Sequence, residues 1–363
     1  MLSAVTRPQV PLRAAVAELP AYVPGSRIPV GAAAFKLSSN ENPYPPLRSV
    51  IAAIADGAAD VNRYPDMFAT ELTEAIAAAL DVQPASIVAG NGSVAVLGHV
   101  LAAVCEAGDD VVIPWRSFEA YPIAISLVGA TTTAVPLADG GRLDLVAMAA
   151  AVTPRTRVVI VCTPNNPTGP AVRAAELDAF LRAVPRDVLV VLDEAYVEFV
   201  RDPDAADGLA VFAAHPNVVV LRTFSKAYGL AGLRVGFAIA RPRLARGIRA
   251  ASTPFGVSHL AQLAALASLR AKDELFARVD TLVAERGRML GALRTQGWVV
   301  PDSEANFVWL PLGERATAFA AASARSGVLV RPFAGDGVRV SVGETEATDD
   351  LLAITGNWLS GDR

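Results

Sequence analysis

The chain has 363 residues, of which 53% are hydrophobic and 19% are charged, and its formal net charge is -4. This composition is typical of a globular protein with a core large enough for two domains, and it excludes an intrinsically disordered chain. The acidic balance also argues against a nucleic-acid partner, because phosphate binding requires a basic surface.

The sequence gives no sign of a metal centre, a disulfide framework or a membrane anchor. Cys105 and Cys162 lie in apolar runs and are expected to be buried free thiols, while His99, His215 and His259 lack the spacing of metal ligands. The first residues, "MLSAVTRPQVPLRAAV", lack the apolar core of a signal peptide. No uncharged apolar run approaches the ~18 residues of a membrane span. We therefore expect a cytoplasmic protein with no metal and no membrane partner.

Strands and helices alternate between about residues 67 and 298, after a proline-rich stretch at 1–30. The predicted helices in the first part of this region are 67–80, 94–108 and 174–184. The predicted strands are 86–89, 109–115, 131–137, 157–162, 187–192, 217–221 and 233–240. Because continuous apolar strands alternate with helices, the pattern predicts an α/β fold with a mostly parallel sheet flanked by helices.

The pattern changes after about residue 248. A long charged helix over 271–297 precedes three predicted strands, 306–312, 328–333 and 337–343, and a terminal helix. This order is typical of a smaller α+β domain. We therefore predict an N-terminal arm over 1–30, a large domain over 31–247 and a small C-terminal domain over 248–363.

Polar residues follow the predicted strands at the sheet edge where ligands of parallel sheets bind. The turn Gly90–Ser93 opens a helix, and its free backbone N–H groups suit a phosphate, although a plain strand–helix link explains it equally well. The segment "TPNNPTG" at 163–169 has the composition of a proline turn. Asp193 ends a buried strand, where an acid needs a polar partner unless it caps a helix.

Lysine is rare in this chain, and one lysine follows a buried strand. Only Lys36, Lys226 and Lys272 occur among 32 basic residues, and Lys226 lies in "TFSKAYGLAGLR", with Arg234 eight residues further on. A buried lysine can lose its proton and attack a carbonyl. Lys36 and Lys272 are not at strand ends and are expected to be solvated. A lysine, a strand-end aspartate, an arginine and a phosphate cradle together suit a phosphorylated aldehyde cofactor.

Six motifs in order make the chain resemble the fold-type I pyridoxal 5'-phosphate (PLP) aminotransferases over nearly its whole length. They are "LSSNENPY" (37–44), "NRYPD" (62–66), "PNNPTG" (164–169), "DEAY" (193–196), "SKAYGLAGLRVG" (225–236) and "RVSVG" (339–343). Within that family the motifs resemble the histidinol-phosphate aminotransferase branch.

The resemblance implies roles for individual residues of a homodimer. Lys226 would carry PLP as a Schiff base and act as general base, while Asp193 would pair with the pyridine nitrogen. The other implied cofactor contacts are Asn166 and Tyr196 at the ring hydroxyl, Trp115 stacked on the ring, Thr223, Ser225, Arg234, Gly92 and Ser93 at the phosphate, and Tyr64 from the neighbouring subunit. The implied substrate contacts are Arg339 for an anion, Arg331 as a second anion contact or a surface residue, Asn42, and Tyr22 on an arm folded over the site.

One departure from the branch bears on the substrate. Val94 and Ala95 follow Ser93 where histidinol-phosphate enzymes tend to carry polar or acidic residues, and the chain looks closest to actinobacterial aromatic (phenylalanine) aminotransferases. We therefore predict transamination of aromatic amino acids with 2-oxoglutarate, with histidinol-phosphate transamination as the alternative. A threonine-phosphate decarboxylase shares much of the scaffold, and carbon dioxide release would identify it. A regulatory module would need a DNA-binding segment, for which the 30-residue arm is too short.

Overall fold

The structure is a computed structural model of the chain, and it describes residues 10–17, 19, 25 and 34–361. The strands are β1 (Phe35–Lys36), β2 (Ile87–Gly90), β3 (Asp110–Trp115), β4 (Thr131–Pro136), β5 (Thr156–Cys162), β6 (Leu189–Asp193), β7 (Val218–Thr223), β8 (Gly236–Ile239), β9 (Phe307–Leu310), β10 (Val328–Leu329), β11 (Arg331–Phe333) and β12 (Gly337–Ser341).

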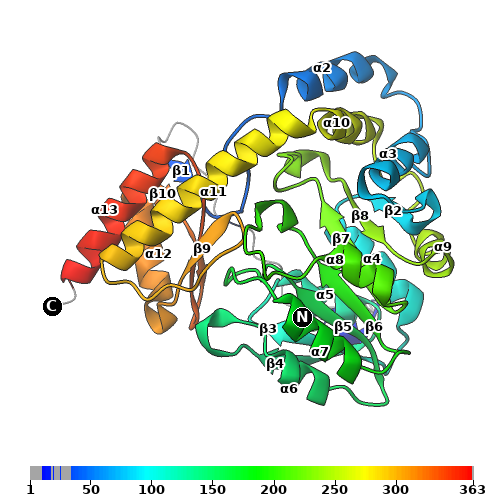
Figure 1. Cartoon of the computed structure of the whole chain (residues 1–363), viewed down its shortest axis with the longest axis horizontal. Helices are drawn as coiled ribbons and strands as arrows, with labels where there is room; N and C mark the ends of the chain where they lie inside the picture. The colour runs from blue at the N-terminus through cyan, green and yellow to red at the C-terminus, as the bar shows by residue number, and fades with distance from the viewer. Residues whose placement is uncertain (1–9, 18, 20–24, 26–33, 362–363) are drawn as a thin grey trace, which may run out of the picture.

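The α-helices are α1 (Ala14–Ala17), α2 (Arg48–Gly57), α3 (Thr70–Leu80), α4 (Ser93–Val104), α5 (Ala120–Leu127), α6 (Leu145–Ala150), α7 (Ala174–Ala183), α8 (Gly208–Ala214), α9 (Pro242–Ala250), α10 (His259–Arg270), α11 (Lys272–Thr295), α12 (Ala316–Arg325) and α13 (Thr345–Gly361). Short 3-10 helices are η1 (Ala58–Asp60), η2 (Pro84–Ser86), η3 (Asp139–Gly141), η4 (Val197–Phe199), η5 (Ala231–Leu233) and η6 (Gly313–Arg315). Figure 1 shows two lobes, with α11 running from the larger lobe across the smaller one.

The larger lobe is built on a seven-stranded sheet in the order β2-β8-β7-β6-β5-β3-β4. Strand β8 runs antiparallel to both of its neighbours, and the remaining pairs are parallel. Every residue of β6 is buried, because helices cover both faces of the sheet. Its side chains alternate between two core clusters, with Val190 and Leu192 in one and Leu189 and Val191 in the other. The predicted α/β fold with a mostly parallel sheet is confirmed.

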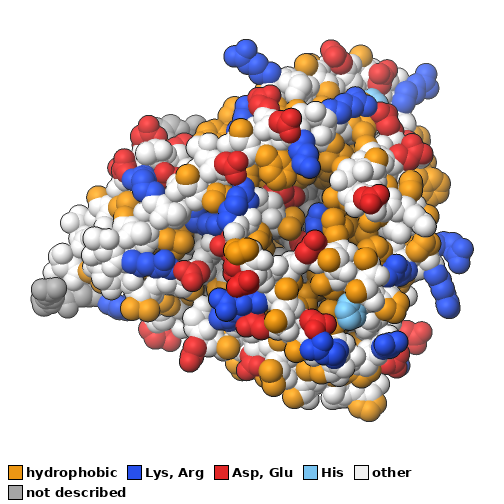
Figure 2. Space-filling view, viewed as in Figure 1, with side chains coloured by type: hydrophobic (Ala, Val, Ile, Leu, Met, Phe, Trp, Pro, Cys, Tyr) orange, Lys and Arg blue, Asp and Glu red, His pale blue; other side chains and the backbone are white. Residues whose placement is uncertain are grey.

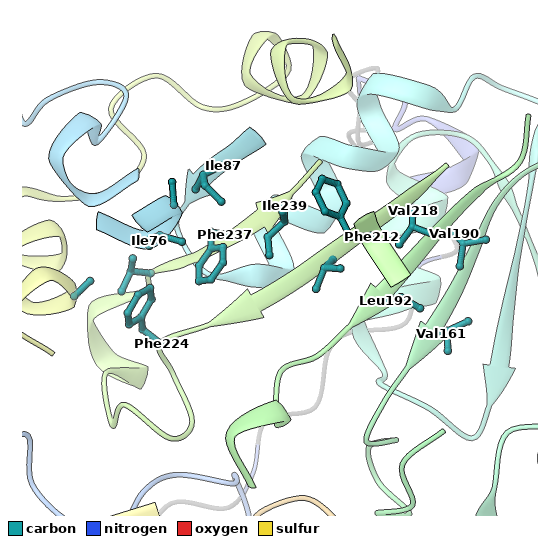
Figure 3. Close-up of a cluster of buried hydrophobic side chains, with 14 of the residues drawn as sticks. Ile76, Ile87, Val161, Val190, Leu192, Phe212, Val218, Phe224, Phe237 and Ile239 are labelled. Carbon is teal, nitrogen blue, oxygen red and sulfur yellow. The ribbon is translucent and has the colours of Figure 1, made fainter. Parts of the chain in front are cut away.

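One of these clusters fixes the direction of the segment that contains the candidate lysine. Figure 3 shows Phe224 beside Phe237 and Ile76, on the same side of the sheet as Val190 and Leu192. Its ring centroid lies 5.9 Å from that of Phe237. Because side chains alternate along an extended segment, burying Phe224 in this layer turns its neighbours in sequence away from the core.

The smaller lobe contains the antiparallel sheet β11-β12-β9, the parallel pair β1–β10 and helices α12 and α13. Strand β1 therefore joins this lobe although it precedes the large sheet in sequence. Helix α10 packs against α2 and α3, and its alanines belong to the core cluster beneath the large sheet. The predicted boundary at residue 248 stays a prediction, but the packing of α10 favours a later one.

Figure 2 shows acidic and basic side chains interspersed over the visible face. Among the described residues, none of the helices combines the length and the apolar character that a membrane span requires. Cys105 and Cys162 are both free and buried, as expected from their apolar surroundings.

Candidate active site

A cavity of about 870 Å³ lies at the carboxyl ends of three neighbouring parallel strands. The last residues of β5, β6 and β7, which are Cys162, Asp193 and Thr223, all line it. The smaller lobe contributes Arg331 and Arg339 to the same cavity. The site is therefore formed by side chains from both lobes.

Lys226 lies half-buried in this cavity, three residues after the end of β7. Burial lowers the pKa of its amine to about 7, and the positive charge of Arg339 contributes to the shift. Its Nζ donates a hydrogen bond to the carbonyl of Ser39 at 3.3 Å. Lys36, in contrast, pairs with Glu41 and is not among the described lining residues of the cavity. A substantial fraction of Lys226 is a neutral nucleophile near pH 7.

Asp193 is buried at the base of the cavity with one carboxylate oxygen available. Its Oδ2 accepts a hydrogen bond from the hydroxyl of Tyr121 at 2.6 Å. Its Oδ1 is also buried, and no described residue donates a hydrogen bond to it. Burial raises the pKa of Asp193 to about 6, and the Tyr121 hydrogen bond partly opposes this shift. A buried carboxylate oxygen without a donor is the expected partner of a cationic ligand group.

Hydroxyl groups and a guanidinium from the residues around Lys226 in sequence form a polar part of the cavity wall. Thr223 and Ser225 line the cavity, as the inward packing of Phe224 requires, and their hydroxyl oxygens lie 3.0 Å apart. Arg234 donates to Ser225 Oγ at 3.3 Å. A Cβ on Gly92 would lie 2.4 Å from Arg234 Nη2, so only glycine leaves room for the guanidinium here. The hydroxyls, the guanidinium and the N-terminus of α4 at Ser93 make a cradle for an anion.

A chain of hydrogen bonds fixes the polar groups above Asp193. Asn40 Nδ2 donates to the hydroxyl oxygen of Tyr196 at 3.0 Å. Arg339 donates through Nη1 to Asn166 Oδ1 at 2.6 Å and through Nη2 to the carbonyl of Ser38 at 2.9 Å. Burial raises the pKa of Tyr196 above its ordinary value, so its hydroxyl keeps its proton. These bonds leave the Tyr196 hydroxyl and the Asn166 Nδ2 as donors toward the cavity.

The opposite wall of the cavity is apolar and is formed by α4, α5 and the turn between β3 and α5. Its side chains come from two helices whose other faces pack into the core. The apolar lining residues of these elements are Val94, Ala95, Gly98, Phe118, Ala120, Ile123, Ala124, Leu127 and Val128, and the polar residues Ser117, Glu119 and His99 line the cavity from the same elements. A wall of this composition suits an apolar or aromatic ligand group.

Residues 33–354 match the family model described as aminotransferase class I and II. The chain belongs to the class I and II aminotransferases. An aromatic amino acid aminotransferase of Streptomyces avermitilis is 56% identical over 345 residues, which cover 95% of this chain and 96% of that protein. A protein of the same name from Thermobifida fusca is 55% identical, covering 94% of this chain and 96% of that protein.

The fold is also that of a solved histidinol-phosphate aminotransferase of Sinorhizobium meliloti, crystallised with pyridoxal-5'-phosphate. The two chains superpose with a TM-score of 0.83 at 31% identity, covering 91% of this chain and 92% of that one. The predicted family and the predicted fold class are confirmed by these matches.

The aminotransferase cavity contains ten of the predicted site residues. They are Ser93, Asn166, Asp193, Tyr196, Thr223, Ser225, Lys226, Arg234, Arg331 and Arg339. Gly92 lies directly behind Arg234. The residues that the sequence predicts at strand ends and in the lysine motif are therefore brought together, although their individual roles stay predictions.

Trp115 is not among the described lining residues. Its ring packs against the core cluster on one face of the large sheet, with the Arg116 guanidinium 4.7 Å from the ring centroid. Phe118, three residues further on, lines the cavity instead. Trp115 is the last residue of strand β3, so the alternation of side chains along the strand decides which face of the sheet it packs on. Phe118 comes from the turn that follows. The structure therefore favours Phe118 for the predicted aromatic contact.

Two further predicted residues, Asn42 and Tyr64, lie elsewhere. Asn42 donates through Nδ2 to the carbonyl of Ala227 at 3.0 Å, so it supports the segment beside Lys226 without lining the cavity. Tyr64 is 84% exposed, and its ring stacks on Phe255 with centroids 4.8 Å apart. Tyr22 lies outside the described residues. Of the predicted arm, Gly25 lines the cavity and α1 packs against α5.

Sequence reasoning missed Tyr121, Asn40 and Glu119 in the aminotransferase site. Tyr121 is fully buried and bonded to Asp193, and Asn40 is two residues from the predicted Asn42 in the same motif. Glu119 lines the cavity and pairs with Arg331. The motif at 37–44 includes Asn40, but the contacts of Asn40 are with residues far away in sequence, and no local pattern reveals them.

Proposed function

We propose that the chain is a PLP-dependent aminotransferase that moves the amino group of phenylalanine or tyrosine to 2-oxoglutarate. The observation that carries this proposal is one cavity that is lined by the half-buried Lys226, the buried Asp193 and an apolar wall. The relatives named aromatic amino acid aminotransferase, at 56% and 55% identity, support the aromatic substrate class.

The residues of the cavity fit PLP. Asp193 Oδ1, which lacks a donor among the described residues, suits the protonated pyridine nitrogen. The ring hydroxyl oxygen is an acceptor, and Tyr196 and Asn166 each have a donor left for it. The cradle of Thr223, Ser225 and Arg234 suits the phosphate.

When bound, PLP supplies an electron sink for the electrons that remain after a substrate loses its α-proton. Lys226 would hold the aldehyde carbon in the resting enzyme and, once released, would carry the α-proton at Nζ. A lysine with a pKa of about 7 is suited to both tasks, because it gives and takes a proton near neutral pH. Asp193 would keep the pyridine nitrogen protonated, since its carboxylate lines the cavity and its Oδ1 has no donor among the described residues.

Arg339 would bind the substrate carboxylate. Its guanidinium is oriented by Asn166 Oδ1 and the carbonyl of Ser38, so it is held in place before the substrate enters. The side chain of the substrate would then lie along the apolar wall, with Phe118 contributing an aromatic surface. Burying a phenyl ring there is favourable by roughly 1.5–3 kcal/mol, whereas the same apolar surface offers no hydrogen bond to the nitrogens of an imidazole.

We further propose a cytoplasmic homodimer. Tyr64 exposes 84% of its surface in one chain and has an aromatic neighbour, Phe255, that orients its ring. A tyrosine presented in this way suits the predicted contact with the cofactor phosphate of a neighbouring subunit. Each site would then need both chains.

The deciding experiment measures initial rates with phenylalanine, tyrosine and histidinol phosphate, each with 2-oxoglutarate. We expect kcat/KM for phenylalanine and tyrosine to exceed that for histidinol phosphate by about 10²-fold. Lys226→Ala serves as the control that shows turnover comes from this site. A preference for histidinol phosphate would replace the proposed substrate class, and release of carbon dioxide without amino transfer would replace the reaction.

A further inference from the structure

Glu119 and Arg331 form an ion pair inside the active-site cavity. Arg331 Nη2 lies 2.7 Å from Glu119 Oε2, and both residues line the cavity. The Arg331 side chain is 10% exposed and that of Glu119 is 30% exposed. Glu119 precedes α5 and its side chain accepts no capping hydrogen bond from that helix, so the helix does not require a carboxylate here. The pair thus connects the larger lobe to the smaller one at the substrate side of the cavity.

The two arginines of the smaller lobe are cross-strand partners. Arg331 on β11 lies directly opposite Arg339 on β12, so both side chains leave the same face of the sheet. Their guanidinium carbons lie 5.5 and 5.8 Å from the centroid of the Phe333 ring. Two like charges side by side repel each other and attract anions, and Glu119 compensates one of them.

The charges in the cavity are unequal in number. Leaving aside His99, the cations among the described lining residues are Lys226, Arg234, Arg331 and Arg339. The carboxylates among them are Asp193 and Glu119. Asp193 accepts a hydrogen bond from Tyr121, whereas Glu119 pairs directly with Arg331, so Glu119 is the carboxylate placed to control Arg331.

A transaminase for aromatic amino acids must accept two kinds of side chain in one site. The aromatic ring is uncharged, whereas the side chain of glutamate or 2-oxoglutarate carries a second carboxylate. We propose that Glu119 is a specificity-determining residue that holds Arg331 while an aromatic side chain is bound and competes with the distal anion of an acidic substrate for it. This inference rests on the proposed function, because it concerns the substrates named there.

The physical reason is competition for one guanidinium. Glu119 already pairs with the Arg331 guanidinium and repels a second carboxylate, so it reduces the affinity for anionic side chains. An uncharged ring does not compete for the guanidinium. The Glu119–Arg331 ion pair therefore stays formed beside the ring, with a net charge near zero. Glu119 therefore favours aromatic over anionic side chains while leaving Arg331 able to accept 2-oxoglutarate. Removing the carboxylate should tighten the binding of ligands with two anionic ends.

A second ion pair provides a matched control. Arg116 and Asp336 join the same turn of the larger lobe to the hairpin that contains Arg331, with Nη2 and Oδ2 2.6 Å apart. Neither residue is among the described lining residues of the cavity. Asp336→Asn therefore removes one interlobe carboxylate beside the site without changing the charge inside it.

The test compares Glu119→Gln, Glu119→Asp and Asp336→Asn with the wild-type PLP-loaded enzyme. Dissociation constants are measured for two unreactive ligands, glutarate and 3-phenylpropanoate, by calorimetry. We expect Glu119→Gln to shift their affinity ratio toward glutarate by ~10-fold, which corresponds to about 1.4 kcal/mol. Glu119→Asp, which retains the charge, should keep most of the wild-type ratio, and Asp336→Asn should keep all of it.

Each outcome is decisive for Glu119. An equal loss of affinity for both ligands in Glu119→Gln would mean that the pair only holds the lobes together, and an unchanged ratio would mean that Arg331 does not meet the distal anion. Both results overturn the proposal. If Glu119→Gln does not fold, Glu119→Ala is measured against the same ratio, and the wild-type ratio is followed with increasing salt. A failure of the wild type to transaminate phenylalanine would reject the proposed function, and the ligand ratio would still decide the role of Glu119.

Discussion

Replacing Gly92 with alanine should disturb the phosphate cradle and leave the rest of the site in place. The backbone at Gly92 has φ 93° and ψ 153°, a region that is essentially restricted to glycine and costs other residues about 1–3 kcal/mol. The new Cβ would also lie 2.4 Å from Arg234 Nη2 and 3.1 Å from its Cζ, so the guanidinium must move. Losing one hydrogen bond to a charged group costs about 1.5–3 kcal/mol, which weakens PLP binding by roughly 10–150-fold.

The assay titrates the apoenzyme with PLP and measures the dissociation constant, together with the melting temperature of the apoenzyme. Gly140→Ala is the control, because Gly140 also has a positive φ, 69°, but a Cβ there meets nothing within 4 Å. We expect both variants to lose stability and only Gly92→Ala to lose PLP affinity. Wild-type PLP affinity in Gly92→Ala would refute the assignment of Arg234 to the phosphate.

Four further predictions follow from the same geometry. Asp193→Asn should retain PLP but slow the proton-transfer half-reaction by at least about 10²-fold in single-turnover measurements, since the ring nitrogen loses its negative partner; an unchanged rate would contradict the role. The pKa of Lys226, lowered to about 7, predicts that PLP capture by the apoenzyme accelerates as the pH rises through 7 and levels off near 8; a rise that continues to pH 10 would indicate an ordinary lysine. Inactive Lys226→Ala and an impaired Tyr64→Phe protein should regain activity when mixed, because hybrid dimers contain one intact site; no recovery despite subunit exchange would place Tyr64 in its own subunit. The double change Val94→Asp and Ala95→Glu should lower the preference for phenylalanine over histidinol phosphate in kcat/KM, and an unchanged ratio would remove this pair from the specificity argument.

The sequence predicted the large sheet because its signals are local. The apolar runs 187–192 and 217–221 overlap the strands β6 and β7, and the polar residues that end these strands, Asp193 and Thr223, both line the cavity. Parallel strands place their carboxyl ends at one edge, so the order of residues along the chain suffices for this part of the site. The lysine motif follows β7 by the same rule.

The rest of the site depends on contacts that no local pattern records. Asn40 is held by Ser341 and Tyr196, which are 301 and 156 residues away in sequence. The choice between Trp115 and Phe118 depends on how the chain turns after β3, which the strand pattern does not specify. Glu119 and Arg331 are separated by 212 residues and meet only because the two lobes pack together. These positions follow from tertiary packing.

The contacts between the lobes make the proposed cofactor site and the proposed substrate site interdependent. Arg339 of the smaller lobe donates to Asn166 of the larger one, 173 residues away, and this bond determines that Asn166 presents Nδ2 to the cavity. A substrate carboxylate that draws Arg339 toward itself would therefore also act on a group that faces the cofactor. The same arginine contributes to the low pKa of Lys226, so neutralising its charge with a carboxylate raises that pKa and favours the protonated amine. If Arg339 binds the substrate carboxylate as proposed, this binding would be coupled to the proton affinity of Lys226, the residue that would carry the α-proton.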